Sequence, residues 1–272
     1  MRFQGRTAIV TGGAQGIGRA IAQALVARGM RVAICDIDPV AAQKAASELD
    51  MPAIVADLRQ VEDVARMVQE AQHALGAIDM LVSNAGFAAG SIDGPSATPD
   101  DLWQASWDLH VMAHLRACRL LLPDMLERGE GWLVNVASAA GLLSQIGDAP
   151  YSATKHAAVS LAQSLAIEHG DQGIHVSVVC PLYVATGLLG YDPDDPKDRP
   201  NDRVLTAADV AQSLVSGLVA GHLLILPHPE AAAFFLRRAS DTDRWIDGMR
   251  RLRRVVFSDE RPESLADLHR RI

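Results

Sequence analysis

After six residues the chain reads Thr7-Ala-Ile-Val-Thr-Gly-Gly-Ala-Gln-Gly-Ile-Gly18. The first five of these residues are a short β-rich apolar run, typical of a buried strand, and a run with helical periodicity begins at Gly16. Glycines at such a junction let the backbone approach a pyrophosphate, which the first amides of the helix can bind. Tight turns also need glycine, so the loop alone is weak evidence. The stretch predicts a strand, a phosphate-binding turn and a helix.

An acidic residue follows this loop at the end of the next predicted strand, where residues 31–36 finish on Asp36. A carboxylate there can accept both ribose hydroxyls of NAD and repel the 2′-phosphate of NADP. The next two residues are Ile37 and Asp38, so no neighbouring cation is present to receive that phosphate. Asp36 could instead cap the following helix, and both roles can hold at once. Together the loop and the acid predict NAD as cofactor.

Strand-like and helix-like runs alternate along the rest of the chain. Strands are predicted at 7–11, 31–36, 53–56, 78–83, 132–137, 174–179 and 223–226. Helices are predicted at 16–28, 39–49, 61–75, 103–126 (interrupted near Pro123), 151–169 and, capped by Thr206, through residue 219. Strands that are apolar on both faces indicate a parallel sheet covered on both sides. We expect an α/β fold, a doubly wound parallel sheet of about seven strands of the Rossmann type, in one domain over residues 1–272.

Composition excludes several classes of protein. The net charge of -8 and the pI near 5.5 argue against a nucleic-acid binder, which usually has a basic face. Cys35, Cys118 and Cys180 are scattered and form no CxxC pair, which predicts neither a disulfide framework nor a metal site. No apolar run approaches the ~18 residues needed to span a bilayer. We expect a cytoplasmic protein without a membrane span.

A tyrosine and a lysine stand four residues apart in Tyr151-Ser-Ala-Thr-Lys155. This spacing puts both side chains on one face of a helix. A phenol is a poor base at its ordinary pKa near 10, and an adjacent ammonium favours the ionised form. The pair therefore suits proton transfer. The alternative is a helix start with a core aromatic residue and a solvated lysine.

The ordered motifs resemble those of the short-chain dehydrogenase/reductase family, in its ordinary, non-extended subgroup. They span about residues 5–227, with a helical tail at 228–272. They are the loop at 11–18, Asp57-Leu58 after the third strand, Asn84-Ala85-Gly86 after the fourth, Ser138 after the fifth, Tyr151-x-x-x-Lys155, and Pro181 with Thr186 after the sixth. The resemblance implies that a nicotinamide cofactor carries the redox step.

The resemblance also implies the role of each site residue. Tyr151 would exchange a proton with the substrate oxygen, Ser138 would orient that oxygen, and Lys155 would bind the nicotinamide ribose and lower the pKa of the phenol. The cofactor contacts that it implies, with those of the glycine loop, are Gly12, Gln15, Gly16, Ile17, Gly18, Asp36, Ile37, Asp57, Leu58, Asn84, Ala85, Gly86, Tyr151, Lys155, Pro181, Val184 and Thr186. It further implies a homodimer or homotetramer, paired through the helices at 103–126 and 151–169.

Two positions depart from the family pattern. His110 stands where many members carry an asparagine that holds a water near the lysine. Histidine also binds water and passes protons, so a catalytic relay through His110 is a hypothesis, and a packed histidine is the alternative. Leu182 follows Pro181, where the family usually has glycine, and this affects fine specificity.

Two segments near the end have open interpretations. Residues 190–202 are rich in Pro and Asp and form either a solvated loop or a lid over a pocket. In the tail, residues 230–239 and 241–256 are expected to be helices, and 258–272 polar and partly mobile. The second helix carries an apolar stripe at Trp245, Met249, Leu252 and Val256, beside Arg250, Arg251, Arg253 and Arg254. That stripe binds either a membrane surface or, the interpretation that we favour, its own domain or a neighbouring subunit.

The segments expected to line the substrate pocket are 86–96, 139–149 and 182–189. They offer Phe87, Leu142, Leu143, Ile146, Leu188 and Leu189, no Arg or Lys, and the polar exceptions Gln145 and Asp148. The sequence thus predicts an NAD-dependent oxidoreductase whose substrate is an apolar small molecule, a secondary alcohol or ketone that can be bulky. The alternatives are a 3-oxoacyl-thioester reductase of the same family and, from another class, a non-catalytic NAD-binding scaffold or sensor.

Overall fold

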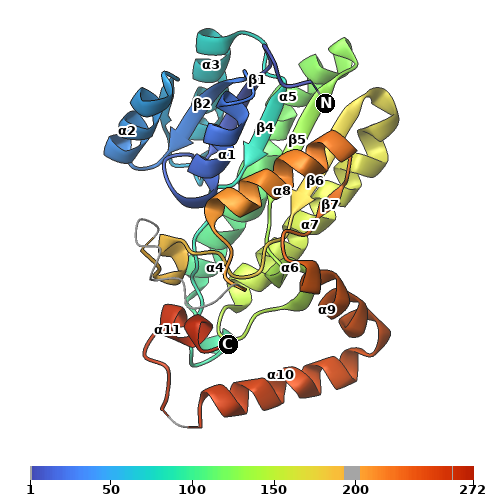
Figure 1. The fold of residues 1–272 in the computed structure, drawn as a ribbon. Helices are drawn as coiled ribbons and strands as arrows, with labels where there is room; N and C mark the ends of the chain where they lie inside the picture. The colour runs from blue at the N-terminus through green and yellow to red at the C-terminus, as the bar shows by residue number, and fades with distance from the viewer. Residues whose placement is uncertain (1, 193–202, 259) are drawn as a thin grey trace.

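A seven-stranded parallel sheet forms the centre of the molecule, in the order β3-β2-β1-β4-β5-β6-β7 (Figure 1). The computed structural model describes residues 2–192, 203–258 and 260–272. The strands are β1 (Thr7–Thr11), β2 (Arg31–Asp36), β3 (Ala53–Val55), β4 (Met80–Ser83), β5 (Gly131–Val136), β6 (Ile174–Val179) and β7 (Leu224–Ile225). Each predicted strand is present within a few residues, which confirms the doubly wound fold.

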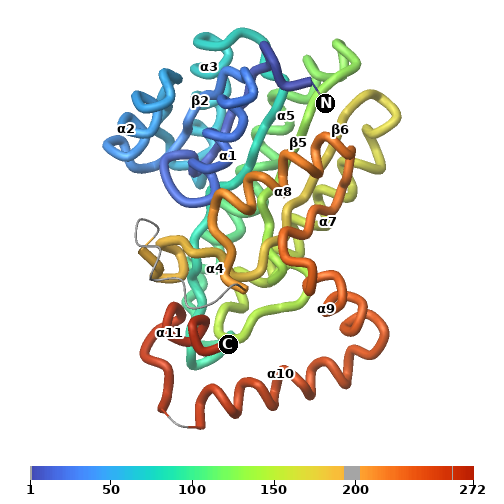
Figure 2. The backbone as a smooth tube through the Cα atoms, viewed as in Figure 1, coloured from blue at the N-terminus to red at the C-terminus, as the bar shows by residue number. Residues whose placement is uncertain are grey.

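Helices cover both faces of this sheet and extend beyond one edge (Figure 2). Those following the strands are α1 (Gly16–Val26), α2 (Pro39–Leu49), α3 (Val61–Leu75), α4 (Asp100–Trp107), α5 (Ala113–Arg128), α6 (Ala140–Leu143), α7 (Ala149–His169) and α8 (Ala207–Ala220). The tail adds α9 (Pro229–Ser240), α10 (Thr242–Val256) and α11 (Leu265–Arg270). Among the described helices, none is both long and apolar enough to cross a membrane.

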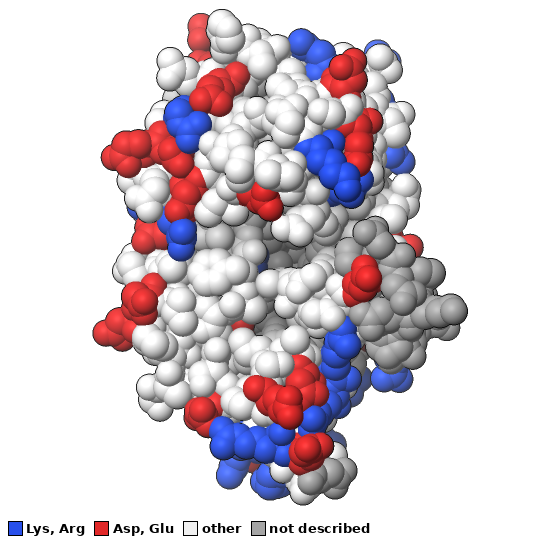
Figure 3. Space-filling model, turned by 90° about the vertical axis from the view of Figure 1, so that its left-hand side faces the viewer, with Lys and Arg blue, Asp and Glu red and all other residues white. Residues whose placement is uncertain are grey.

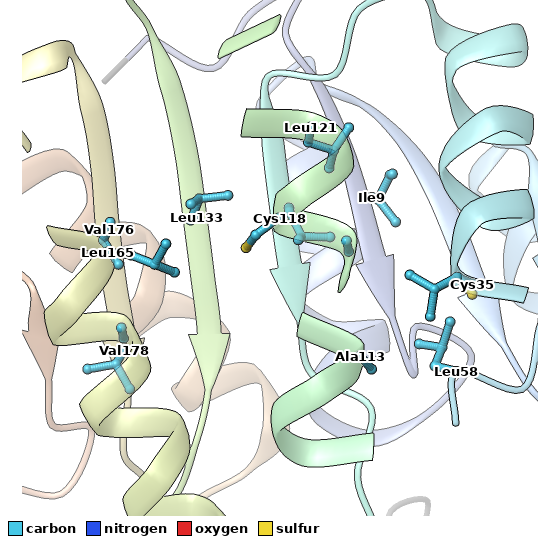
Figure 4. Packing of buried hydrophobic residues seen from close by; sticks show 14 of the residues in the cluster. Ile9, Cys35, Leu58, Ala113, Cys118, Leu121, Leu133, Leu165, Val176 and Val178 are labelled. Atoms are coloured by element: carbon cyan, nitrogen blue, oxygen red, sulfur yellow. The ribbon is translucent and has the colours of Figure 1, made fainter. Parts of the chain in front are cut away.

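The two faces of the sheet bury separate apolar clusters because successive strand residues point to opposite sides. On β1, Ile9 belongs to the cluster that contains buried residues of α3, α5 and α7, whereas Ala8 and Val10 belong to the cluster that contains those of α1, α2 and α8. Figure 4 shows Cys118 and Leu121 of α5 facing the sheet in the first cluster. This double burial explains why the strands are almost continuously apolar.

The topology fixes where a ligand can bind. β1 pairs with β2 on one side and with β4 on the other. The strands that follow are therefore added in opposite directions away from β1 in the two halves of the sheet. In sheets of this kind the crevice at such a switch point, outside the carboxyl ends of the strands, is the binding place. The glycine loop between β1 and α1 lies at this point (Figure 1).

The expected long helix at 103–126 is wrong in two respects. It is divided into α4 and α5 by a π-helical turn, Asp108–Met112, in which one extra residue shifts the helical register at His110. At its other end the helix does not break at Pro123 but continues to Arg128. Pro123 is exposed, as is Arg119 one turn earlier, so the carbonyl left without an amide partner can be hydrated.

The tail also differs from expectation at its end. The helices at 230–239 and 241–256 are confirmed as α9 and α10, and Asp241 caps α10 by accepting the Arg244 N–H. Part of the segment 258–272, for which partial mobility stays a prediction, forms α11, whose Leu268 and His269 are buried. Most of the lid predicted at 190–202 lies outside the described residues.

Candidate active site

A large cavity of about 1380 Å³ lies at the carboxyl edge of the sheet. It gathers most of the residues that the sequence singles out: Gly12, Gln15, Gly16, Ile17, Asp36, Ile37, Asp57, Leu58, Asn84, Ala85, Gly86, Ser138, Tyr151, Lys155, Pro181, Val184 and Thr186. Of the predicted catalytic and cofactor-binding residues, Gly18 and His110 do not line it. Residues spread over 175 positions of the chain, from Gly12 to Thr186, thus meet in one place.

The glycine loop is shaped by close packing against the segment after β4. Gly12 has a φ of +58°, and a Cβ there would lie 2.9 Å from the Cα of Ala85. The Asn84 amide donates to the carbonyls of Thr11 at 3.0 Å and of Gly12 at 3.1 Å. The loop backbone is therefore held open toward the cavity, as a phosphate cradle requires.

Gly18 has a packing role rather than a lining one. It lies inside the first turn of α1, and a Cβ there would come within 2.0 Å of the Gly12 carbonyl oxygen. Gly18 does not line the cavity, and its contact with a cofactor stays a prediction. Its missing side chain lets the helix approach the loop, and this places the first turn of the helix beside the cavity.

Asp36 lies at the end of β2, and two backbone N–H groups orient its carboxylate. Its Oδ2 accepts the Ala14 N–H at 3.1 Å and its Oδ1 accepts the Asp38 N–H at 3.2 Å. The side chain that caps α2 is that of Asp38, which accepts from Val40 N and Ala41 N. The alternative in which Asp36 is the helix cap is therefore wrong, and Asp36 lines the cavity.

Arg59 is a cation in the cavity wall that the sequence did not place there. Its guanidinium binds the Asp57 carboxylate, with Nη2 2.7 Å from Oδ2 and Nε 2.9 Å from Oδ1. This hydrogen bonding holds the pKa of Asp57 below its ordinary value. Asp57 and Arg59 are thus paired with each other in the cavity wall.

Tyr151 and Lys155 lie one turn apart on α7, at the other end of this set. The Lys155 Nζ donates to the Val136 carbonyl at 2.9 Å and lies 5.4 Å from the centre of the Tyr151 ring. Asp148 caps the helix by accepting the Tyr151 N–H at 3.1 Å, and this hydrogen bond fixes where α7 begins relative to the tyrosine. The helix start thus delivers both side chains to the cavity.

Burial controls the pKa values of this pair. It raises the pKa of Tyr151 to about 12, and a hydrogen bond with the Ser138 side chain acts in the opposite direction with less effect. Burial also lowers the pKa of Lys155 to about 8. That Lys155 lowers the pKa of the phenol stays a prediction, and in this structure burial has the larger effect and raises that pKa. The low-dielectric surroundings disfavour both charged forms.

Ser138 lies just after β5, where its hydroxyl meets the tyrosine. The same oxygen accepts the Ala140 N–H at 3.1 Å and lies 3.5 Å from the Pro181 carbonyl. These contacts anchor the serine between the start of α6 and the segment after β6. The hydroxyl is therefore fixed beside Tyr151 at the cavity wall.

His110 lies behind the cavity, between the segment after β4 and α7. Its Nε2 accepts the Phe87 N–H at 3.2 Å, and its Nδ1 lies 2.8 Å from the Thr154 hydroxyl. Because Nε2 accepts, Nδ1 carries the proton and donates it to Thr154, which in turn donates to the Pro150 carbonyl at 2.8 Å. Burial, followed by the charge of Lys155, places the pKa of His110 well below its ordinary value. Both ring nitrogens are engaged, which argues against a relay through this ring.

His228 is a site residue that sequence reasoning missed. It follows β7, is buried, and lines the cavity. Its Nδ1 accepts the Leu182 N–H at 3.1 Å, and its Nε2–H lies 3.1 Å from the carbonyls of both Tyr183 and Arg203. The ring therefore joins the segment after β6, where leucine replaces the expected glycine, to the chain that leads into α8. Only the unusual His-Pro pair after the last strand could have signalled it.

The substrate end of the cavity is largely apolar, as expected, with three differences. Phe87, Leu143, Ile146, Leu188, Leu189, Gln145 and Asp148 line it. Leu142 does not, because the single turn of α6 directs it into the core. Arg203 and Arg270 enter from other segments, and α10 contributes Trp245, Met249 and Leu252. Figure 3 shows a hollow on this side, bordered mostly by uncharged residues.

A family model described as short chain dehydrogenase matches residues 6–197. The chain belongs to this family of oxidoreductases. Oxidoreductase UcpA from Escherichia coli is 33% identical over 91% of this chain and 92% of its own length. Meso-2,3-butanediol dehydrogenase from Serratia marcescens is 33% identical over 75% of this chain and 81% of its own. Among solved structures, a short chain dehydrogenase/reductase from Burkholderia phymatum in complex with NAD superimposes with a TM-score of 0.79 at 28% identity, covering 89% of this chain and 96% of that one.

Proposed function

We propose that this member of the family is an NAD-dependent alcohol dehydrogenase or carbonyl reductase that acts on apolar, bulky secondary alcohols or ketones. The observation that carries the proposal is the convergence of Ser138, Tyr151 and Lys155 on the same cavity as the glycine loop and Asp36. A dinucleotide seated on the loop would extend along this cavity toward the tyrosine. The relatives that are named as dehydrogenases support the reaction class.

The residues at the first end of the cavity fit NAD. Glycine backbone at Gly12 and Gly16 would hold the pyrophosphate against the start of α1. Asp36 would accept the ribose hydroxyls and repel a 2′-phosphate through its negative charge. Arg59, the cation of this wall, is paired with Asp57 and is therefore not expected to bind that phosphate. Lys155 would hold the nicotinamide ribose, and Thr186, whose side chain lies 3.5 Å from a Cβ built on Gly16, would hold the carboxamide.

The protein groups around the reacting carbon have distinct tasks. When bound, NAD supplies the acceptor for the hydride of the carbinol carbon. The Tyr151 hydroxyl gives its proton to a ketone oxygen as the hydride arrives; in the oxidation direction it must first lose that proton, and its phenolate then takes the proton of the alcohol hydroxyl. Ser138 orients this oxygen and stabilises its developing negative charge. A phenol with a pKa of about 12 is protonated at neutral pH, so the free protein is prepared to donate.

We propose a positioning role for His110 in place of the relay. Its ring ties Phe87, in the wall of the cavity, to Thr154 on the helix of the catalytic pair. A Cβ on Gly86 would approach its Nε2 to 3.2 Å, which shows how tightly this corner is packed. The histidine thereby holds the segment after β4 in a fixed position relative to α7.

We also propose that the protein is a homodimer or homotetramer, paired through α5 and α7. Leu120 on α5 and Ile167 on α7 are 44% and 80% exposed, although both are large and apolar. Isolated apolar residues are common on surfaces, so this is supporting evidence only. Sedimentation of the purified protein measures its mass directly, and a monomer at micromolar concentration would contradict the pairing.

The reaction is tested with a panel of secondary alcohols and ketones, each assayed with NAD and with NADP by absorbance of the reduced nicotinamide. We expect turnover of uncharged bulky alcohols with NAD and little with NADP. Preference for NADP together with activity on a 3-oxoacyl carrier thioester would favour the thioester reductase instead. NAD binding without turnover of any member of the panel would indicate a binding protein and refute the proposal.

A further inference from the structure

The tail helices form part of the cavity wall far from the glycine loop. Phe234 of α9 and Trp245, Met249 and Leu252 of α10 line the cavity. The Trp245 indole N–H donates to the Leu143 carbonyl at 3.4 Å, and its ring lies 6.3 Å from that of Phe234. In Figure 1, α10 crosses the molecule beyond the carboxyl edge of the sheet. The apolar stripe of α10 therefore faces its own chain and not a membrane.

These apolar side chains face space rather than a packed core. Trp245, Met249 and Leu252 are only partly buried, whereas the opposite side of α10 exposes Arg250 and Arg254. A helix turns its apolar stripe toward whatever removes that stripe from water. Here the stripe meets a cavity that continues to Tyr151, so a ligand in the cavity can cover it.

α11 fastens this wall to the loops around the catalytic groups. The His269 Nε2 lies 3.1 Å from the Ile146 carbonyl oxygen, and the side-chain amide nitrogen of Gln145 lies 2.5 Å from Nε2 and 3.1 Å from Nδ1 of the same ring. The neighbouring Arg270 donates to the Gly190 carbonyl, and its guanidinium lies 4.4 Å above the Tyr191 ring. The tail is thus joined to the segments on both sides of the substrate end.

A second set of contacts leaves α11 little room to shift. Leu268 packs directly beneath Gly147, where a Cβ would come within 2.5 Å of its Cδ2. Arg261, in the chain before α11, forms an ion pair with Asp93 in the loop after β4. Because three loops of the cavity meet the tail, its position shapes the space that is left for a substrate.

We propose that α9, α10 and α11 form a distal compartment, lined by Phe234, Trp245, Met249 and Leu252, which binds the hydrocarbon body of the substrate away from the reacting carbon. This inference rests on the proposed function. Single ligand pockets usually measure about 300–1,000 Å³, so a cavity of about 1380 Å³ holds more than a dinucleotide. The lining selects an uncharged alcohol or ketone with an alicyclic or aromatic body.

The compartment is tested by steady-state kinetics with isopropanol, cyclohexanol and cyclododecanol on Trp245→Ala. We expect kcat/KM for cyclododecanol to fall about tenfold or more, mainly through KM, because apolar contacts that are equal in ground and transition states affect KM. For isopropanol the change should stay within about twofold, since it does not reach the wall. Equal losses for all three alcohols, or no loss for cyclododecanol, would overturn the proposal.

Two further variants separate the compartment from a folding defect. Ile246 follows the tryptophan in the chain but is 46% exposed and does not line the cavity. Ile246→Ala should therefore leave the kinetics with all three alcohols unchanged. Met249→Ala, one turn along the stripe, should repeat the size-dependent loss. Circular dichroism and the Kd for NAD should match the wild type in each variant. A size-dependent loss in Ile246→Ala would contradict the assignment of the wall.

A binding experiment keeps this inference distinct from the proposed function. If the wild type oxidises no alcohol, the reaction proposal fails, and the compartment is then judged by calorimetric titration of the NADH-bound protein with cyclododecanone. Binding that is about tenfold weaker in Trp245→Ala than in the wild type would support the compartment. Equal binding by both proteins, or none by the wild type, would overturn it.

Discussion

The two ends of the cavity are constructed differently. At the dinucleotide end, short segments that follow β1, β2 and β4 meet at the switch point of the sheet, and backbone amides and side chains such as Asn84 fix one another. At the substrate end, the walls come from segments far apart in the chain, as in the contact between Gln145 and His269. The fold itself supplies the first end, whereas the tail completes the second.

This difference has a functional consequence. The dinucleotide end depends on the backbone path of the glycine loop and on a few side chains that hold it, such as Asn84 and Asp36. The substrate end is formed by side chains on helices that the sheet does not need, and it can change without disturbing the reaction. We therefore expect variants at the first end to alter cofactor use or chemistry, and variants at the second to alter selectivity.

The largest effect is expected from Tyr151→Phe, at the point where both ends meet. Loss of the hydroxyl should lower kcat at least about a hundredfold, the scale of general acid–base catalysis. The Kd for NAD, measured by calorimetry, should be unchanged. The matched control is Tyr183→Phe, a second tyrosine of the cavity wall, which should retain most of the activity. Near-normal turnover in Tyr151→Phe would remove the proposed acid–base group.

The next effect is expected from Asp36→Ala, at the dinucleotide end alone. Removing the carboxylate should weaken NAD about tenfold or more and reduce discrimination against NADP, because a charged acceptor of two hydroxyls is lost. The ratio of kcat/KM for the two dinucleotides measures this. Asp38→Ala is the control, since it removes only the cap of α2, at about 1 kcal/mol of stability. An unchanged ratio in Asp36→Ala would contradict the assignment.

A smaller effect, at the substrate end, is expected from His228→Ala. The variant should lose several-fold in kcat/KM for bulky alcohols, because the Leu182 amide loses its acceptor. Burial lowers the pKa of His228, so the folded protein holds the neutral ring. Stability from this group is therefore present above the ordinary pKa of about 6.5 and is lost as pH falls toward the lower folded value.

That sign gives a second measurement on the same residue. Between pH 7 and pH 5 (assay conditions) the wild type should lose unfolding free energy more steeply than His228→Ala, in thermal unfolding followed by circular dichroism. His228→Gln, which retains an acceptor, should restore part of the kinetic loss. Parallel pH dependence in wild type and His228→Ala would show that the ring does not control this loop.

The smallest effect is expected from His110→Ala. If the ring only positions the segment after β4, kcat should fall a few-fold and the pH profile of kcat should keep its shape, since no proton passes through the ring. His110→Asn, which retains a donor and an acceptor, should recover part of the activity. A large loss of kcat with an altered pH profile, restored by added imidazole, would reinstate the relay.

How far the sequence predicts the molecule follows the same division. The positions of the strands, the glycine loop, Asp36 and the Tyr151–Lys155 pair are marked by local sequence patterns, and all of them were predicted. The π-helical turn at Asp108–Met112 was not, because helical periodicity does not reveal one inserted residue.

The tail and the pKa values needed the structure. The stripe of Trp245 and Met249 was visible, but its target was not, since periodicity says that a face is covered and not by what. The contact between His269 and Gln145 joins residues more than a hundred positions apart, and no local sequence pattern indicates it. The raised pKa of Tyr151 reflects burial in the folded site, which the spacing to Lys155 does not report.

The most direct test of the account is a crystal structure of the protein with NADH and cyclododecanone. We predict a ketone oxygen within about 2.6–3.2 Å of both the Ser138 and the Tyr151 hydroxyls, the hydrogen-bond reach that proton transfer requires. The ring of the ketone should lie against Trp245 and Met249. A ketone bound elsewhere, or a Tyr151 hydroxyl turned away from the carbonyl oxygen, would contradict the account.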